Sequence, residues 1–150
     1  MVLDELKPVT KAAAIELQRA CPWVVYTSGK RSWMDQARAM AQNTMKDRQW
    51  VGKVYKREPE LQAWLDANPN VIDLEGIENG LYFTLMGYAK GVLDRFAHPA
   101  GRAFDLQEPY PQWQDATVTK IKSLAGLELF LRGEAGLPIW HCQFKECKGV

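Results

Sequence analysis

The sequence is poor in histidine, in cysteine and in net charge. Its 150 residues include two histidines and three cysteines, and nineteen basic side chains nearly balance eighteen acidic ones, which leaves a formal charge of +1. So small a charge creates no overall field that would attract nucleic acid or anionic lipid, and we expect no nucleic-acid partner. An odd number of cysteines without an export signal favours reduced thiols over a disulfide framework.

Long apolar runs are also missing. The uncharged stretch 79–89 is much shorter than the roughly 20 apolar residues that span a bilayer, so we expect no stable membrane insertion. Asp4 and Glu5 stand near the N-terminus, where a secretory signal needs a basic start, so we expect no signal peptide. These features predict a protein that is made in the cytoplasm and stays soluble.

The composition is that of a folded protein, with 47% hydrophobic and 25% charged residues. A chain of this length corresponds to one domain, since single cores usually occupy about 100 to 200 residues. We therefore expect one domain over residues 1–150, and we expect it to be monomeric. Its core needs no disulfide or metal to be stable, so a bound metal would be free to take part in chemistry.

Hydrophobic periodicity predicts an α+β fold in which helices flank a small antiparallel sheet. Ser32 lies three residues before Asp35, a pair typical of the start of a helix. Strands are expected over Trp23–Thr27, Arg102–Leu106 and Ile139–Phe144. Helices are expected up to about Cys21, from Ser32 onward, over Glu58–Ala67, within Leu74–Ala97 and over Asp115–Leu124.

The two histidines are the most informative residues. His98 precedes a turn that contains Gly101, and Asp105 follows in a strand-like segment, so an imidazole and a carboxylate can converge on one point. His141 could complete the group from the last strand. Two imidazoles and one carboxylate suit catalytic zinc, with the fourth position left to water. From spacing alone, two unrelated histidines, one in the core and one in a loop, are the favoured interpretation.

Three blocks of sequence resemble one family of enzymes. The segment His98-x-x-Gly101-x-Ala103-x-Asp105 is similar to the signature of the LAS metallopeptidases, zinc enzymes that cut D-alanyl-D-alanine or L-alanyl-D-glutamate bonds in peptidoglycan. Trp140 and His141 resemble the closing Trp-His pair of that family, with Gln143 following. Upstream, the segment from Ser28 through Arg31 to Gln36 is similar to its Ser-Gly-x-Arg block.

The resemblance covers residues 24–144 and implies the Hedgehog/D-Ala-D-Ala peptidase fold. It implies that His98, Asp105 and His141 bind Zn²⁺ and that Arg31 holds a substrate carboxylate, to which a guanidinium can donate two parallel hydrogen bonds. Ser28 and Gln36 are expected to contribute to substrate binding. The alternatives are an exposed Arg31 beside a helix and a Gln36 that is plain surface.

One position departs from the family pattern. The family has Glu or Asp three residues before its last histidine, as the general base, and this sequence has Pro138, which cannot accept a proton. Glu134 is the nearest candidate for a replacement, and Glu128 and Glu146 are weaker ones. Another acid, or no base at all, remains open.

The resulting hypothesis is a zinc peptidase that hydrolyses stem peptides of peptidoglycan. With no export signal, it resembles a phage lysis enzyme, or endolysin, that a holin releases from the host cytoplasm to the cell wall; a bacterial housekeeping enzyme is the alternative origin. The rival function is a non-catalytic protein that binds the cell wall or has a structural role, on the same scaffold with its base lost. A metallonuclease is a third possibility, against which the balanced charge argues.

Cys142 and Cys147 suggest a competing metal site with His141. Adjacent strand residues point to opposite faces, so His141 and Cys142 can reach one ion only across a bulge. A small buried hydrophobic residue is the commoner role for such a cysteine.

Overall fold

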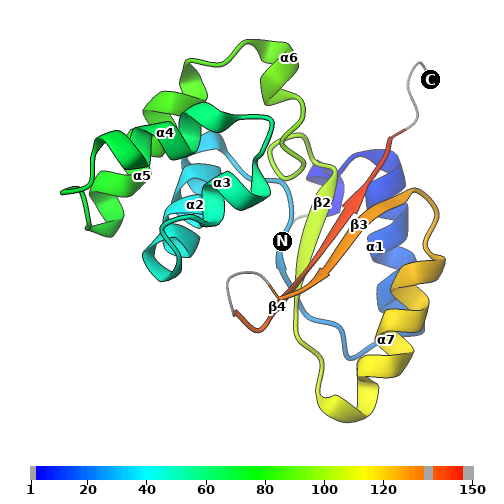
Figure 1. Cartoon of the computed structure of the whole chain (residues 1–150). Helices are drawn as coiled ribbons and strands as arrows, with labels where there is room; N and C mark the ends of the chain where they lie inside the picture. Colours follow the sequence, from blue (N-terminus) through cyan, green and yellow to red (C-terminus); the bar gives the residue numbers. More distant parts are fainter. Residues whose placement is uncertain (1–2, 134–136, 147–150) are drawn as a thin grey trace. The chain divides into compact units, whose positions relative to one another are not determined.

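The structure, a computed structural model, describes residues 3–133 and 137–146. Its contacts divide the chain into two units, one made of Met1–Arg31 with Phe96–Val150 and the other of Ser32–Arg95 (Figure 1). The expected α+β class is confirmed, with one small antiparallel sheet and seven α-helices among the described residues. No helix in this part of the chain is both long enough and apolar enough to span a bilayer. The single domain over 1–150 stays a prediction.

The first unit contains the sheet. Its strands lie in the order β1-β2-β4-β3, and every neighbouring pair is antiparallel. Helices α1 and α7 lie on one side of this sheet (Figure 1). The elements of this unit are the 3-10 helix Leu3–Glu5, α1 (Pro8–Ala20), β1 (Tyr26–Ser28), β2 (Ala103–Gln107), α7 (Pro111–Ser123), β3 (Leu127–Arg132) and β4 (Ile139–Phe144).

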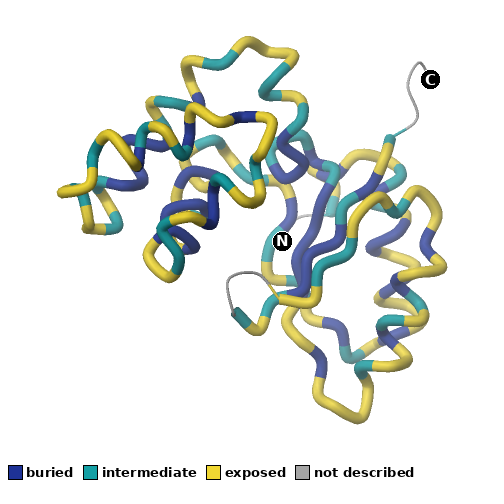
Figure 2. The backbone as a smooth tube through the Cα atoms, in the orientation of Figure 1, coloured by how far each residue is buried: buried dark blue, intermediate teal, exposed yellow. Residues whose placement is uncertain are grey.

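The two faces of the central strands differ because side chains alternate along a strand. The even-numbered residues of β2 and β4 join the hydrophobic core with residues of α1 and α7. Both strands are buried along most of their length (Figure 2). The odd-numbered residues, which include Asp105 and His141, therefore point to the face away from these helices. The core side of the two strands consists of Phe104, Leu106, Trp140, Cys142 and Phe144.

The first turn of α1 is capped from the far end of the chain. No side chain of its own N-cap residue bonds the helix. Instead the carboxylate of Glu146 accepts hydrogen bonds from the backbone N–H groups of Val9 at 3.0 Å and Thr10 at 3.1 Å. A carboxylate at this position satisfies N–H groups that lack a partner within the helix and complements the helix dipole.

One strand prediction needs correction, and one strand was not predicted. The expected strand Trp23–Thr27 is instead β1, Tyr26–Ser28, because pairing with Leu106 and Asp105 fixes its position. Trp23 lies outside it and stacks on Trp113, with the ring centroids 5.3 Å apart. Strand β3 was not predicted at all. Its leucines and Glu128 are good helix formers, and its partner β4 supplies the hydrogen bonds that make it a strand.

The second unit consists of helices α2 (Trp33–Lys46), α3 (Trp50–Val54), α4 (Pro59–Ala67), α5 (Leu74–Met86) and α6 (Lys90–Leu93). The predicted start of α2 is confirmed, since the Ser32 hydroxyl accepts the Asp35 N–H at 3.1 Å. Helix α5 tolerates Gly80 for a packing reason, because a Cβ there would overlap the ring of Trp64.

Candidate metal centre

A tight turn places His98 beside the start of β2. The Gly101 N–H donates to the His98 carbonyl at 3.1 Å, which closes the turn. Gly101 has φ +75°, a conformation that glycine adopts without strain, and a Cβ there would lie 3.0 Å from the Glu5 carbonyl oxygen. The sequence-based expectation that glycine folds the chain back at this position is therefore confirmed.

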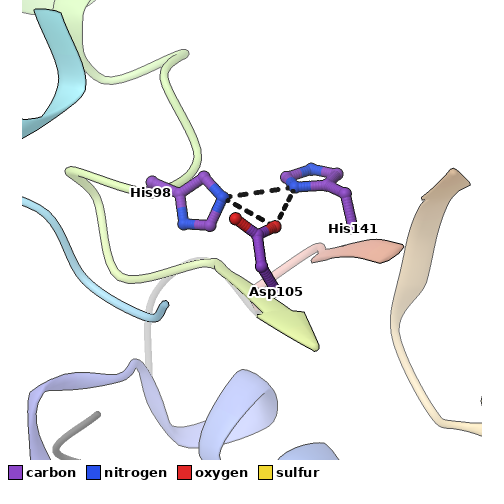
Figure 3. A group of neighbouring side chains, drawn as sticks. All are labelled: His98, Asp105 and His141. Carbon is purple, nitrogen blue, oxygen red and sulfur yellow. Dashed lines mark hydrogen bonds and ion pairs between the residues drawn. The ribbon is translucent and has the colours of Figure 1, made fainter. Parts of the chain in front are cut away.

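The sheet brings the other two residues together. Asp105 and His141 are direct partners across the β2–β4 pair, so their side chains share a face. His98 Nε2 and His141 Nδ1 lie 3.2 and 2.9 Å from Asp105 Oδ1 and 3.2 Å from each other (Figure 3). All three residues are buried, with at most 6% of their surface exposed.

The hydrogen bond made by His98 Nδ1 determines whether Nε2, the ring nitrogen that faces Asp105, carries a hydrogen. Nδ1 lies 2.8 Å from the Gly29 carbonyl oxygen, which can only accept, so Nδ1 carries a hydrogen. Burial lowers the pKa of His98 and outweighs the opposing effect of Asp105, so the ring is neutral. In the neutral ring Nε2 has only its lone pair, and this lone pair faces Asp105.

The ring of His141 is arranged in the same way. Its Nε2 lies 3.3 Å from Oε1 of Gln143, another acceptor, so in the neutral ring the lone pair is on Nδ1. Arg31 Nη2 donates to the other oxygen of Asp105, Oδ2, and this ion pair favours the carboxylate form, in which Oδ1 can only accept. Three acceptor atoms thus face one point, and a cation there, either a metal ion or a proton, satisfies them.

The spacing of these atoms suits a tetrahedral metal ion. Zinc with ligands at 2.0 to 2.1 Å has neighbouring ligand atoms about 3.3 to 3.4 Å apart. The three observed distances, 2.9, 3.2 and 3.2 Å, are slightly shorter, so small side-chain movements would open the site. The group could therefore hold a metal ion. Among the described residues, no other histidine, cysteine, aspartate or glutamate joins these three as a fourth ligand.

No family model, curated protein or solved structure matches the chain.

Arg31 lies beside the three donors. Its Nη2 donates to Oδ2 of Asp105 at 2.7 Å, so the two oxygens of this carboxylate face different partners. The Arg31 side chain is 18% exposed, which rules out the alternative of a fully exposed arginine beside a helix. Its predicted contact with a substrate carboxylate stays a prediction.

The other two expected substrate-binding residues, Ser28 and Gln36, belong to different units. Ser28 pairs with Asp105 across β1 and β2, and its hydroxyl oxygen is buried without a hydrogen-bond partner among the described residues. Gln36 belongs to the other unit, where it is buried and its Nε2 donates to the Tyr55 hydroxyl at 3.1 Å. Gln36 is thus not plain surface, and its role in substrate binding stays a prediction.

The candidates for the general base have different outcomes. Glu134 lies outside the described residues. Glu146 caps α1, which packs on the opposite face of the sheet from the three donors, so that alternative is wrong. The Glu128 carboxylate accepts from Nε2 of Gln143 at 3.1 Å and is thus linked to the side of His141 that faces away from the other donors.

The competing cysteine site does not form with His141 and Cys142. Cys142 is fully buried in the core on the opposite face of β4, as expected for a small hydrophobic residue, and burial raises the pKa of its thiol. Cys147 lies outside the described residues.

Two features of the site were missed by sequence reasoning. They are the acceptors behind the imidazoles, namely the Gly29 carbonyl and the Gln143 amide, and the contact between Arg31 and Asp105. Gly29 and Gln143 both stand in the family-like blocks, which is the signal that could have indicated them.

Proposed function

We propose that this chain is a zinc-dependent peptidase that hydrolyses amide bonds in peptidoglycan stem peptides, on a fold of the LAS or Hedgehog/D-Ala-D-Ala peptidase type. One observation carries the proposal: His98, Asp105 and His141 direct three acceptor atoms at one buried point although they come from distant parts of the sequence. Uncompensated acceptors of this kind are costly inside a protein, and a bound cation removes that cost.

In this proposal His98 Nε2, Asp105 Oδ1 and His141 Nδ1 hold the metal ion. When bound, zinc supplies Lewis-acid polarisation of a carbonyl and acidifies a water molecule. Arg31 binds a carboxylate of the stem peptide, an assignment supported by its position against Asp105. Ser28, which pairs with Asp105 in the sheet, would contribute to substrate binding. Glu134 would take a proton from the attacking water molecule and deliver it to the leaving amine as the amide C–N bond breaks.

Digestion of purified muropeptides, followed by mass spectrometry and a zinc assay, tests this function. We expect one zinc per chain, new free amino groups and no new reducing sugars. Glu134→Gln should retain zinc and lose cleavage, whereas the matched control Glu108→Gln, at an exposed position after β2, should keep both. New reducing ends would instead indicate a glycosidase, and nicking of plasmid DNA would indicate a nuclease.

The rival candidate is a non-catalytic protein that binds the cell wall, and Pro138 is the observation that favours it. It predicts zinc binding and association with peptidoglycan without any cleavage of muropeptides. The same digestion therefore separates the two functions.

The proposed setting is a phage lysis enzyme that leaves the host cytoplasm through a holin and acts as a monomer on the cell wall. Adding the pure protein to bacteria with a permeabilised outer membrane should lyse them. His98→Ala should abolish this lysis.

A further inference from the structure

Gln143 connects a carboxylate to one of the three donor residues. Its amide nitrogen Nε2 donates to Oε2 of Glu128 at 3.1 Å, and its amide oxygen Oε1 lies 3.3 Å from His141 Nε2. One short side chain therefore contacts an acid at one end and an imidazole at the other.

The acid determines the orientation of the amide. An ionised carboxylate only accepts hydrogen bonds, so the NH₂ group of Gln143 must face Glu128 and its oxygen must face His141. If the amide turned over, its oxygen would oppose the carboxylate and its NH₂ group would oppose His141 Nε2. The hydrogen of a neutral His141 would then move to Nδ1, the atom that faces Asp105.

A bulge brings Glu128 to this position. Leu127 pairs with Phe144 and Leu129 pairs with Gln143, so Glu128 is the extra residue between two ladder pairs, next to Gln143. Arg102 Nη1 lies 3.5 Å from Glu128 Oε2 and also donates to the Phe144 carbonyl at 3.2 Å. This cation helps to hold the Glu128 carboxylate in place.

His98 needs no comparable side chain, because a backbone carbonyl, that of Gly29, accepts from its Nδ1. The acceptor beside His141 Nε2 is instead the side chain of Gln143. We infer that Glu128 and Gln143 are positioning residues that hold His141 in the tautomer with hydrogen on Nε2, leaving Nδ1 to bind a metal ion. This inference rests on the proposed zinc site.

Nitrogen-15 NMR of the imidazoles in metal-free protein, at a pH where His141 is neutral, tests the tautomer directly. The wild type should show His141 almost entirely with hydrogen on Nε2. Gln143→Met, which removes the acceptor at similar size, and Glu128→Gln, which allows the amide to turn over, should each give a mixture. The double variant with Glu128→Gln and Gln143→Glu restores a donor facing an acceptor, so it should recover the wild-type tautomer.

Zinc affinity, measured by competition with a chelator, gives the second readout. Groups that orient a metal ligand typically contribute about 10- to 100-fold to metal affinity. We expect a loss in that range for Gln143→Met and a smaller loss for Glu128→Gln, because the Glu128 side chain is 34% exposed. The double variant should recover most of the affinity, and Gln107→Met, at an exposed position of β2, should change nothing.

The inference is overturned if the His141 tautomer of both single variants equals that of the wild type, or if the double variant is no better than either single variant. Its failure differs from failure of the proposed function. A wild-type protein that binds no zinc would refute the zinc site, whereas the tautomer measurement needs no metal and still decides the role of Gln143.

Discussion

Zinc should stabilise this protein against unfolding, and the stabilisation should require all three donors. The donor atoms already lie within about half an ångström of tetrahedral spacing in the folded chain. The unfolded chain scatters them, since His98 and His141 are 43 residues apart in sequence. A metal ion therefore binds the folded state much more tightly than the unfolded one, and folding and binding are linked.

The size of the effect follows from that linkage. At free zinc 100 times above the dissociation constant, a single site stabilises the folded state by about 2.7 kcal/mol. For a chain of this length, 1 kcal/mol corresponds to a shift in Tm of about 2 to 4 °C, so zinc should raise Tm by about 5 to 11 °C. Each further tenfold increase in free zinc should add about 1.4 kcal/mol.

Thermal unfolding followed by circular dichroism, with free zinc set by a metal buffer, measures this shift. His98→Ala, Asp105→Ala and His141→Ala should remove it, whereas Asp115→Ala, at an exposed position of α7, should keep it. Magnesium should have no effect, because it prefers an octahedron of oxygen ligands. A wild-type Tm that does not change with zinc, or an equal shift in the three alanine variants, would refute the reasoning.

Two further substitutions examine the surroundings of the site. Arg31→Lys keeps the charge but loses the planar guanidinium that can donate two parallel hydrogen bonds. A hydrogen bond to a charged group contributes about 1.5 to 3 kcal/mol, so KM for stem peptides should rise at least about tenfold while kcat changes little. An unchanged KM would exclude the substrate contact. Gly101→Ala forces a side chain into left-handed backbone next to the Glu5 carbonyl and should lower the free energy of unfolding by about 1 to 2 kcal/mol in urea titrations. Full stability of that variant would show that the turn can relax.

Local sequence predicts the helices and strands whose ends are determined by residues close to them in the chain. Strand β4 has the predicted bounds, Ile139–Phe144. It begins after Pro138 with a β-branched and an aromatic residue, types that favour strands. Helix α2 begins after Ser32 as expected, since its cap lies within four residues. Strand β3 was not predictable in the same way, because its residues also suit a helix and its partner strand decides the outcome.

The same distinction applies to the candidate site, where the donors follow from local sequence and the contacts around them follow from strand pairing. The three donors could be predicted because their residue types and spacing match a known pattern, and alternation along the strands fixes their common face. The contact of Arg31 with Asp105 and the link from Glu128 through Gln143 to His141 depend on strand register and on a bulge. Sequence alone gives neither, because a shift of one residue moves every side chain to the other face.

Pro138, a departure from the family-like pattern, has a structural explanation in the sheet. Its carbonyl oxygen accepts the Glu108 N–H at 2.9 Å, which extends the β2–β4 ladder beyond the pair of Gln107 and Ile139. Proline has no N–H to contribute, so the position just before a strand is one that it can occupy without losing a hydrogen bond. Pro138 is therefore compatible with the start of β4. A peptidase built on this sheet would need a proton acceptor from another position in the chain. In the proposed peptidase this proton acceptor is Glu134, in the segment between β3 and β4. A non-catalytic protein that binds the cell wall would not need Glu134.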